Sequence, residues 1–224
     1  MHIPDGFLSA PVAAAGYAAS AAVLALAVKR SGQTLEERQV PLLGVTTAFV
    51  FAAQMLNFPV AMGTSGHFLG AVLAAVLLGP LNGCLVFAAV LTLQCLLFAD
   101  GGLTALGANF FNMGVVGGVG GYALFRLATA LLPRSRRGFL FAAALASWIS
   151  VVASASACAV ELALSGTVPL GLVLPAMGMV HAIIGIGEAV ITVATLSVIL
   201  AARPDVVGEW RGPSPVLLVG ETSS

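Results

Sequence analysis

Long apolar stretches, separated by short polar segments or by segments containing glycine and proline, follow one another along almost the whole chain. A helix needs about 20 apolar residues to cross a hydrocarbon core of about 30 Å. The pattern predicts seven spans, at residues 11–28, 40–58, 68–79, 81–98, 103–132, 139–160 and 172–202. We therefore expect an all-α fold, a polytopic membrane helix bundle of residues 1–202 followed by a short cytoplasmic tail at residues 203–224.

The third predicted span is the weakest, because twelve residues at about 1.5 Å each are too short for a bilayer. Residues 68–98 could instead form one long helix. A turn at GPLNG (79–83) places every lysine and arginine on one side of the membrane, which the positive-inside rule identifies as the cytoplasm. The charges therefore favour seven transmembrane helices, with the N-terminus outside and the C-terminus inside.

The composition supports a membrane protein and excludes several functions. The chain of 224 residues is 59% apolar and 8% charged, with a mean hydropathy of +1.06, whereas soluble domains are about one-quarter charged. Nine positive charges balance nine negative ones, so no basic patch for nucleic acid is expected. Lys29 is the only lysine and is not part of a P-loop, so the energy for any transport must come from a partner or a gradient.

No motif of a hydrolytic enzyme or resident cofactor is present. The sequence contains no HExxH or GxSxG pattern, so we expect a protein that is not an enzyme. Cys84, Cys95 and Cys158 lie in apolar runs without ligand spacing, and we interpret them as small hydrophobic residues.

The start of the chain, MHIPDG, offers a metal chelate. No basic residue precedes Lys29, so the first segment does not resemble a signal peptide and Met1 is expected to be the mature terminus. The Met1 amine, the His2 amide nitrogen and the His2 imidazole can then close fused five- and six-membered rings on one ion. Such donors favour square-planar Ni(II), Cu(II) or Co(II). A lone second-position histidine also occurs by chance, but here Pro4–Gly6 can fold the terminus back into a pocket.

The chelate leaves one in-plane coordination position vacant. Only two other histidines in the chain could fill it. His67 follows GTSG on the predicted outer side, in the same compartment as Met1, and is the expected fourth ligand. His181 falls near the middle of the last span, with Glu188 seven residues further on the same helical face. Ionisable groups at that depth are expensive, so we expect either a structural polar pair or a role in ion passage and gating.

Small residues recur at the four-residue spacing that lets helices approach closely. The candidates pack either within the bundle or against another subunit; they are Ala14, Ala18, Ala22, Ala48 and Ala52.

Four segments, MHIPDGFLS, AFVFAAQMLNFPVAMGTSGHFLG, QCLLFADGGLTALGANFFNMG and HAIIGIGEAV, resemble the CbiM/NikM family. Its members are substrate-binding components of energy-coupling factor transporters for cobalt and nickel, and the resemblance runs from Met1 to about Leu200. It implies metal binding by Met1, His2 and His67, the same nitrogen set that coordination chemistry suggests.

The resemblance also implies partners and a setting. The partners are a transmembrane coupling subunit, two cytoplasmic ATPase subunits and often a small accessory membrane protein. The setting is a bacterial or archaeal cell membrane, where the imported ion supplies cobalamin synthesis or nickel enzymes. The binding subunit of such a transporter is thought to tip within the membrane during transport.

Polar residues near the predicted ligands are candidates to hold them in place, because metal-bound imidazoles usually donate their other nitrogen to a polar group. These candidates are Asn57, Ser65, Gln94, Asn109 and Asn112. Four planar nitrogens favour nickel slightly over cobalt. Two alternatives remain: a self-sufficient, gradient-driven permease that uses His181 and Glu188, and a membrane-embedded metalloenzyme.

Overall fold

The computed structural model describes residues 1–60, 64–210 and 212, without the side chains of Arg38, Pro59 and Thr64. The α-helices are α1 (Ala10–Thr34), α2 (Val40–Gln54), α3 (Ala71–Leu78), α4 (Pro80–Phe98), α5 (Leu106–Phe110), α6 (Gly121–Leu131), α7 (Arg136–Leu164) and α8 (Leu170–Ala202). A π-helix, η3 (Phe111–Gly120), joins α5 to α6, and η1 (Glu37–Gln39) and η4 (Pro204–Val206) are single 3-10 turns. Two strands, β1 (Asn57–Val60) and β2 (Thr64–His67), form an antiparallel hairpin.

Prolines and polar caps start several of the helices. Prolines lie in the first turns of α1, α2 and α4, where the missing N–H costs nothing. The Ser135 hydroxyl caps α7 by accepting a hydrogen bond of 3.1 Å from the Gly138 N–H. Gly79, with φ of +83°, separates α3 from α4, so residues 68–98 form two helices and not one.

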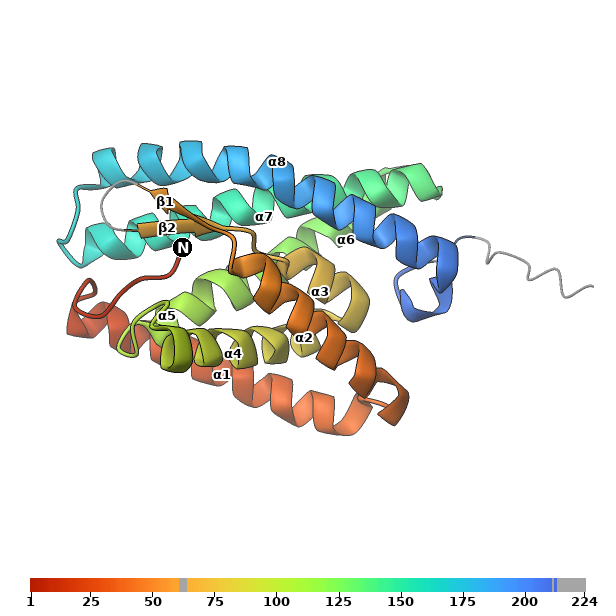
Figure 1. The fold of residues 1–224 in the computed structure, drawn as a ribbon, viewed down its shortest axis with the longest axis horizontal. Coiled ribbons are helices and arrows are strands. Elements are labelled where there is room, and N and C mark those ends of the chain that lie inside the picture. The colour runs from red at the N-terminus through yellow and green to blue at the C-terminus, as the bar shows by residue number, and fades with distance from the viewer. Residues whose placement is uncertain (61–63, 211, 213–224) are drawn as a thin grey trace, which may run out of the picture.

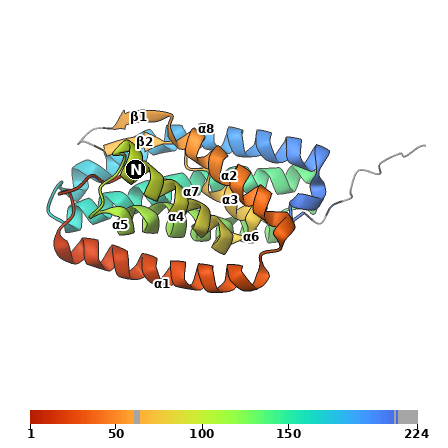
Figure 2. The same cartoon turned by 60° about the horizontal axis from the view of Figure 1, so that its bottom comes forward.

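The helices pack into one elongated bundle (Figure 1). The two longest helices, α7 and α8, run side by side, and α1 lies against α4 on the opposite side. Between these layers lie α3 and η3. The hairpin, the N-terminus and the α7–α8 connection gather at one end, and the chain leaves α8 at the other (Figure 2).

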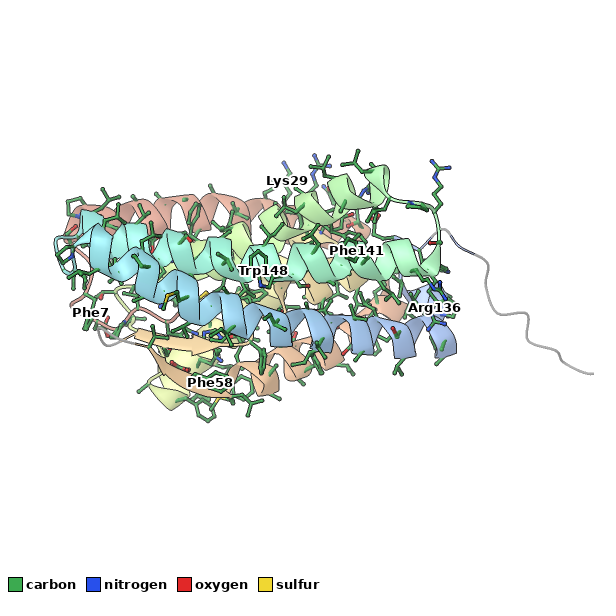
Figure 3. The ribbon with its side chains drawn as sticks, turned by 90° about the horizontal axis from the view of Figure 1, so that it is seen from above. Phe7, Lys29, Phe58, Arg136, Phe141 and Trp148 are labelled. Atoms are coloured by element: carbon green, nitrogen blue, oxygen red, sulfur yellow. The ribbon has the colours of Figure 1, made fainter. Side chains whose placement is uncertain are left out.

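Apolar side chains cover the outside of this bundle, as in a protein surrounded by lipid. Five helical segments in the described residues are long and apolar enough to cross a membrane: α1, α4, Leu106–Leu131, α7 and α8. Only 11% of the apolar window of α1 is buried. Phe141 and Trp148 project from the outer face of α7 (Figure 3). The chain is a multi-pass, helical membrane protein, as the sequence predicts.

Two predicted spans differ from the structure. The third, residues 68–79, contains only the eight-residue α3, about 12 Å long and fully buried, so it does not cross a bilayer as a helix. The second, residues 40–58, stays helical only to Gln54 and continues into β1. The chain beyond Gln54 therefore leaves the helical path as β1, which pairs antiparallel with β2, so the backbone groups between the two strands bond to one another.

Candidate metal centre

The first nine residues form an irregular segment that turns back into the bundle. Residues 1–3 are buried, with at most 3% of any of them exposed. Gly6 has φ of +82°, a conformation that glycine adopts without strain. Oδ1 of Asp5 accepts hydrogen bonds from the Thr104 N–H at 2.7 Å and from the Thr104 hydroxyl at 2.5 Å. The turn that the sequence predicts is present, and it directs the amino terminus inward.

Ile3 is fixed at both of its backbone polar groups. The Asn109 side chain accepts a hydrogen bond from the Ile3 N–H at 2.8 Å and donates to the Ile3 carbonyl at 3.1 Å. The Gly102 N–H donates to the same carbonyl at 2.8 Å. Because Asn109 is itself buried in α5, the residue that follows His2 is attached to the core of the bundle.

The Met1 amine lies against the hairpin. It donates a hydrogen bond to the Ser65 carbonyl and lies 3.4 Å from the Ser65 hydroxyl. Burial lowers the pKa of this amine to about 5. At neutral pH the nitrogen is therefore uncharged, with a lone pair that can bind a metal ion.

His67 is the last residue of β2 and is fully buried. Its Nδ1 lies 2.7 Å from the Phe68 carbonyl oxygen, which can only accept, so Nδ1 carries the proton. The lone pair is then on Nε2, which has no hydrogen-bond partner among the residues that the structure describes. Burial, with the nearby amino terminus, keeps the pKa of His67 well below the ordinary value, so the ring is neutral.

The His2 ring stacks on the His67 ring, with centroids 4.6 Å apart and planes 20° from parallel. Its Nδ1 lies 3.0 Å from Oδ1 of Asp100 but is not aligned for a hydrogen bond. Burial lowers the pKa of His2 as well. In the six-membered chelate ring Nδ1 is the imidazole donor, so closing that ring requires the imidazole to turn away from Asp100. Asp100 is not among the predicted site residues; its signal in the sequence is an acidic residue beside Gly-Gly.

The five candidate supporting residues divide into two groups. Ser65 and Asn109 hold Met1 and Ile3, and Gln94 lies buried beside His2. Asn57 is exposed and lies 3.5 Å from the Asp100 carboxylate. Asn112 instead donates to Glu161 on α7 at 2.6 Å.

His181 and Glu188 lie on one buried face of α8, but the structure corrects the expectation of a direct pair. Nδ1 of His181 lies 2.8 Å from the Met177 carbonyl, and its Nε2 has no partner. Both oxygens of Glu188 accept backbone hydrogen bonds at the start of α3. The reason is that seven residues make about two helical turns, which separates the two side chains by about 10 Å along the axis.

The small residues at helical spacing lie on exposed faces and do not pack inside the bundle; they are Ala14, Ala18, Ala22, Ala48 and Ala52. Close approach between α1 and α5 depends instead on two glycines, Gly16 and Gly107. A Cβ on Gly16 would lie 2.9 Å from the Ala108 nitrogen, and one on Gly107 would lie 2.6 Å from Cα of Tyr17.

A cavity of about 440 Å³ lies beside the candidate ligands. His2, Ser65 and Asp100 line it, together with the exposed residue Leu103, so the cavity communicates with the outside of the bundle. A cavity of about 260 Å³ lies at the opposite end, between α6, α7 and Trp210, and contains none of the predicted ligands.

The candidate centre combines main-chain and side-chain nitrogens. Within the described ranges, no three His, Cys, Asp or Glu side chains form a metal-binding group. The donors brought together are the terminal amine, the first peptide nitrogen and two imidazoles. The amine and the two imidazoles are neutral donors, and the peptide nitrogen becomes a donor when it loses its proton. Such nitrogen donors suit Ni(II) and Co(II) better than hard cations such as Mg²⁺.

Comparisons with known proteins agree with this chemistry. Residues 2–206 match the family model CbiM, described as the cobalt uptake substrate-specific transmembrane region. The chain is 44% identical over 221 residues to a putative fused nickel transport protein NikMN of Archaeoglobus fulgidus, covering 97% of this chain and 72% of that protein. It is 43% identical over 209 residues to a putative metal transport protein of Haloquadratum walsbyi, covering 92% and 93%.

A solved structure has the same fold. The crystal structure of a truncated transition metal transporter superposes with a TM-score of 0.83 at 35% identity, covering 89% of this chain and 98% of that one. Since the family model covers nearly all of the described residues and the relatives and the fold agree, the chain belongs to the CbiM family of cobalt and nickel transport proteins.

Proposed function

We propose that this chain is the substrate-binding component of an energy-coupling factor importer and binds Ni(II) or Co(II) with four nitrogens. These are the Met1 amine, the His2 amide and imidazole nitrogens and Nε2 of His67. The observation that carries the proposal is the position of the amino terminus, which is buried against Ser65 beside the stacked rings of His2 and His67. In this position the terminal nitrogen lies close to both imidazoles, as a shared metal ion requires.

The ion approaches through the outer cavity, where the nitrogen donors replace its bound water molecules. The His2 ring turns from Asp100 to bring Nδ1 into the chelate, and the His2 amide loses its proton. His67 needs no proton transfer, since its hydrogen bond to Phe68 already leaves Nε2 as the donor. Asp100 lies where it can attract the cation before these steps.

The decisive experiment adds one glycine before Met1 and measures Ni or Co bound to the purified protein. The insertion moves His2 to position three and introduces a second amide into the chelate, which leaves no corner for His67. We expect the native metal spectrum, with the contribution of His67, to be replaced by that of a chelate without His67, whereas His2→Ala should lose high-affinity binding. Unchanged coordination by His67 in the extended protein would contradict the proposal.

The remaining parts of the proposal concern topology and partners. Seven passes of the chain, the third made by β2 and the short α3 together, put the metal centre on the outer side and the arginine-containing connections on the inner side. The N-terminus then lies outside, in a bacterial or archaeal cell membrane. A coupling subunit contacts the exposed alanine faces of α1 and α2, and two ATPase subunits supply energy. Two relatives are described as fused nickel transport proteins NikMN, one of them as putative, and this chain covers 72% and 66% of their lengths, which is in keeping with a further component. The imported ion supplies cobalamin synthesis or nickel enzymes.

A gradient-driven permease is tested by the same variants. If His181 and Glu188 carried the ion alone, His2→Ala would leave uptake by cells unchanged. We expect that uptake stops in this variant and requires ATP in vesicles that contain the partner subunits.

A further inference from the structure

Glu188 of α8 reaches the segment that connects the hairpin to α3. Its Oε2 accepts a hydrogen bond from the Leu69 N–H at 2.8 Å, and its Oε1 accepts one from the Gly70 N–H at 2.6 Å. The side chain is 2% exposed, so these bonds form away from water. The carboxylate therefore binds the two N–H groups that directly precede α3, and its negative charge lies next to the N-terminus of that helix, where the helix dipole favours it.

The peptide that Glu188 contacts is also the peptide that contacts His67. The carbonyl of the Phe68–Leu69 peptide accepts the Nδ1 proton of His67 at 2.7 Å, while the N–H of the same peptide donates to Glu188. An imidazole, a peptide and a carboxylate thus form one continuous chain of hydrogen bonds. Hydrogen bonds in such a chain polarise one another, so the carboxylate makes the carbonyl a stronger acceptor.

Two further contacts hold the residues beside this peptide. The Gln54 side chain on α2 donates to the Leu69 carbonyl, which belongs to the next peptide, at 3.0 Å. Gly187 leaves room for the Phe68 ring, because a Cβ there would lie 2.7 Å from Cε1 of that ring. The Phe68–Leu69 peptide is therefore bonded to His67 and, through Glu188, to α8, and the peptide that follows it is bonded to α2.

We propose that Glu188 is a positioning residue for the metal centre, acting through the Phe68–Leu69 peptide to keep the proton of His67 on Nδ1 and the lone pair on Nε2. This inference rests on the proposed role of His67 as a ligand. Carboxylates that orient a metal-binding imidazole usually contact it directly, and their loss costs about 10- to 100-fold in metal affinity. Here one peptide group is inserted between the carboxylate and the imidazole.

The first test uses the metal-free protein, so its result does not depend on metal binding. Nitrogen NMR of the full chain with ¹⁵N-labelled histidine reports the protonated ring nitrogen of each of three histidines. We expect the Nδ1–H form for His67 in the wild type and appearance of the Nε2–H form in Glu188→Ala. His181, whose Nδ1 contacts Met177, is an internal control and should not change. In Glu188→Gln, which keeps one acceptor oxygen, the fraction of His67 in the Nε2–H form should lie between the fractions in the wild type and in Glu188→Ala.

The second test measures Ni(II) affinity by competition with a chromophoric chelator, together with the visible spectrum of the bound ion. We expect Glu188→Ala to weaken binding by about 10- to 100-fold and Glu188→Gln by less. Thr192→Val is the matched control: Thr192 is buried one turn further along α8 and bonds to Ser147 at 3.2 Å, away from the hairpin. It should alter neither the tautomer nor the affinity.

An unchanged His67 tautomer in both Glu188 variants, with native helical circular dichroism, would overturn the inference. Equal loss of affinity in Glu188→Ala and Thr192→Val would also overturn it, because the effect would then be general destabilisation. If the wild type itself failed to bind Ni(II) through its amino terminus, the proposed function would fail, while the tautomer result would still decide the role of Glu188.

Discussion

Asn109 shows how a single side chain can define where a chain end lies. By bonding both the N–H and the carbonyl of Ile3, it leaves the preceding two residues little freedom beyond rotation of their side chains. The amine and amide nitrogens of the chelate are therefore held close to one geometry before any ion arrives. Such preorganisation reduces the entropy lost on binding.

Removing this attachment should weaken metal binding. We expect Asn109→Ala to reduce Ni(II) affinity by about 10- to 100-fold, the usual effect of losing a group that supports a ligand. Asn109→Asp should have a smaller effect, because a carboxylate still accepts from the Ile3 N–H. Asn82→Ala is the control, since Asn82 bonds to Ser31 at the other end of the bundle. Equal affinities for the Asn109 and Asn82 variants would show that the attachment is not used.

The buried amine predicts a characteristic dependence on pH. Its folded-state pKa of about 5 lies below the ordinary value of 8.0, so between these values only the unfolded chain binds the proton. Without metal, stability should fall as the pH is lowered from 8 to about 5 and then level off. As the pH is lowered toward 5, metal affinity should fall about tenfold per pH unit, because binding displaces one amide proton. Below pH 5 the affinity should fall more steeply, because the ion then also displaces a proton from the amine.

This dependence can be followed by competition titrations at four pH values between 4.5 and 7.5, with chemical unfolding of the metal-free protein beside them. An affinity that stays constant over this range would exclude a deprotonated amide from the donor set.

For individual residues, the sequence identifies the candidate ligands but not all of the side chains that contact them. His2, His67 and Met1 are predictable because a terminal His and an internal His have few other chemical uses together. The contacts of Asp100 with His2 and of Glu188 with Leu69 join residues about 100 or more positions apart. No local pattern encodes these contacts, which depend on how the helices pack.

The elements differ in how well their apolar patterns reveal them. The long helices α1, α4, α7 and α8 follow from continuous apolar runs, with bounds close to the predicted ones. The hairpin was not predicted, because its four-residue strands are short and Pro59 lies in one of them. The π-helix η3 has the same composition as an α-helix, and its extra residue per turn leaves no mark in a hydropathy pattern.

The contact between α1 and α5 depends on a missing side chain. A Cβ on Gly107 would lie 2.6 Å from the backbone of Tyr17, so Gly107→Ala must force the helices apart. We expect a loss of about 1–3 kcal/mol in stability. Gly171→Ala, where a Cβ would meet nothing within 4 Å, should be neutral or stabilising by less than about 1 kcal/mol. Thermal unfolding in detergent, followed by helical circular dichroism, gives the comparison; equal midpoints for the two variants would refute it.

The whole molecule has two chemically different ends. The candidate ligands, the hairpin and the outer cavity lie at one end, and Arg136 and the last turn of α8 lie at the other (Figure 3). The family and the membrane character were predictable from the sequence because both depend on residue types. The structure of the third predicted span was not, since α3 is buried and too short to span a bilayer as a helix.

The proposed orientation can be tested in intact cells. In a variant whose three cysteines are replaced, a new cysteine at Thr167 should react with a membrane-impermeant thiol reagent, whereas one at Gln33 should react only after the membrane is permeabilised. Both positions are exposed in the structure, so burial does not explain a difference between them. The reverse labelling pattern would place the metal centre on the inner side.

The burial of Met1 also constrains how the protein is made. Under the proposed function, a formyl group left on this nitrogen would displace packed neighbours and block a metal donor, so any such group has to be removed while the start of the chain is still accessible to enzymes. Affinity tags for purification belong after α8 for the same reason. The competence of the transporter would then be decided by an enzymatic trimming step that takes place before the bundle is assembled.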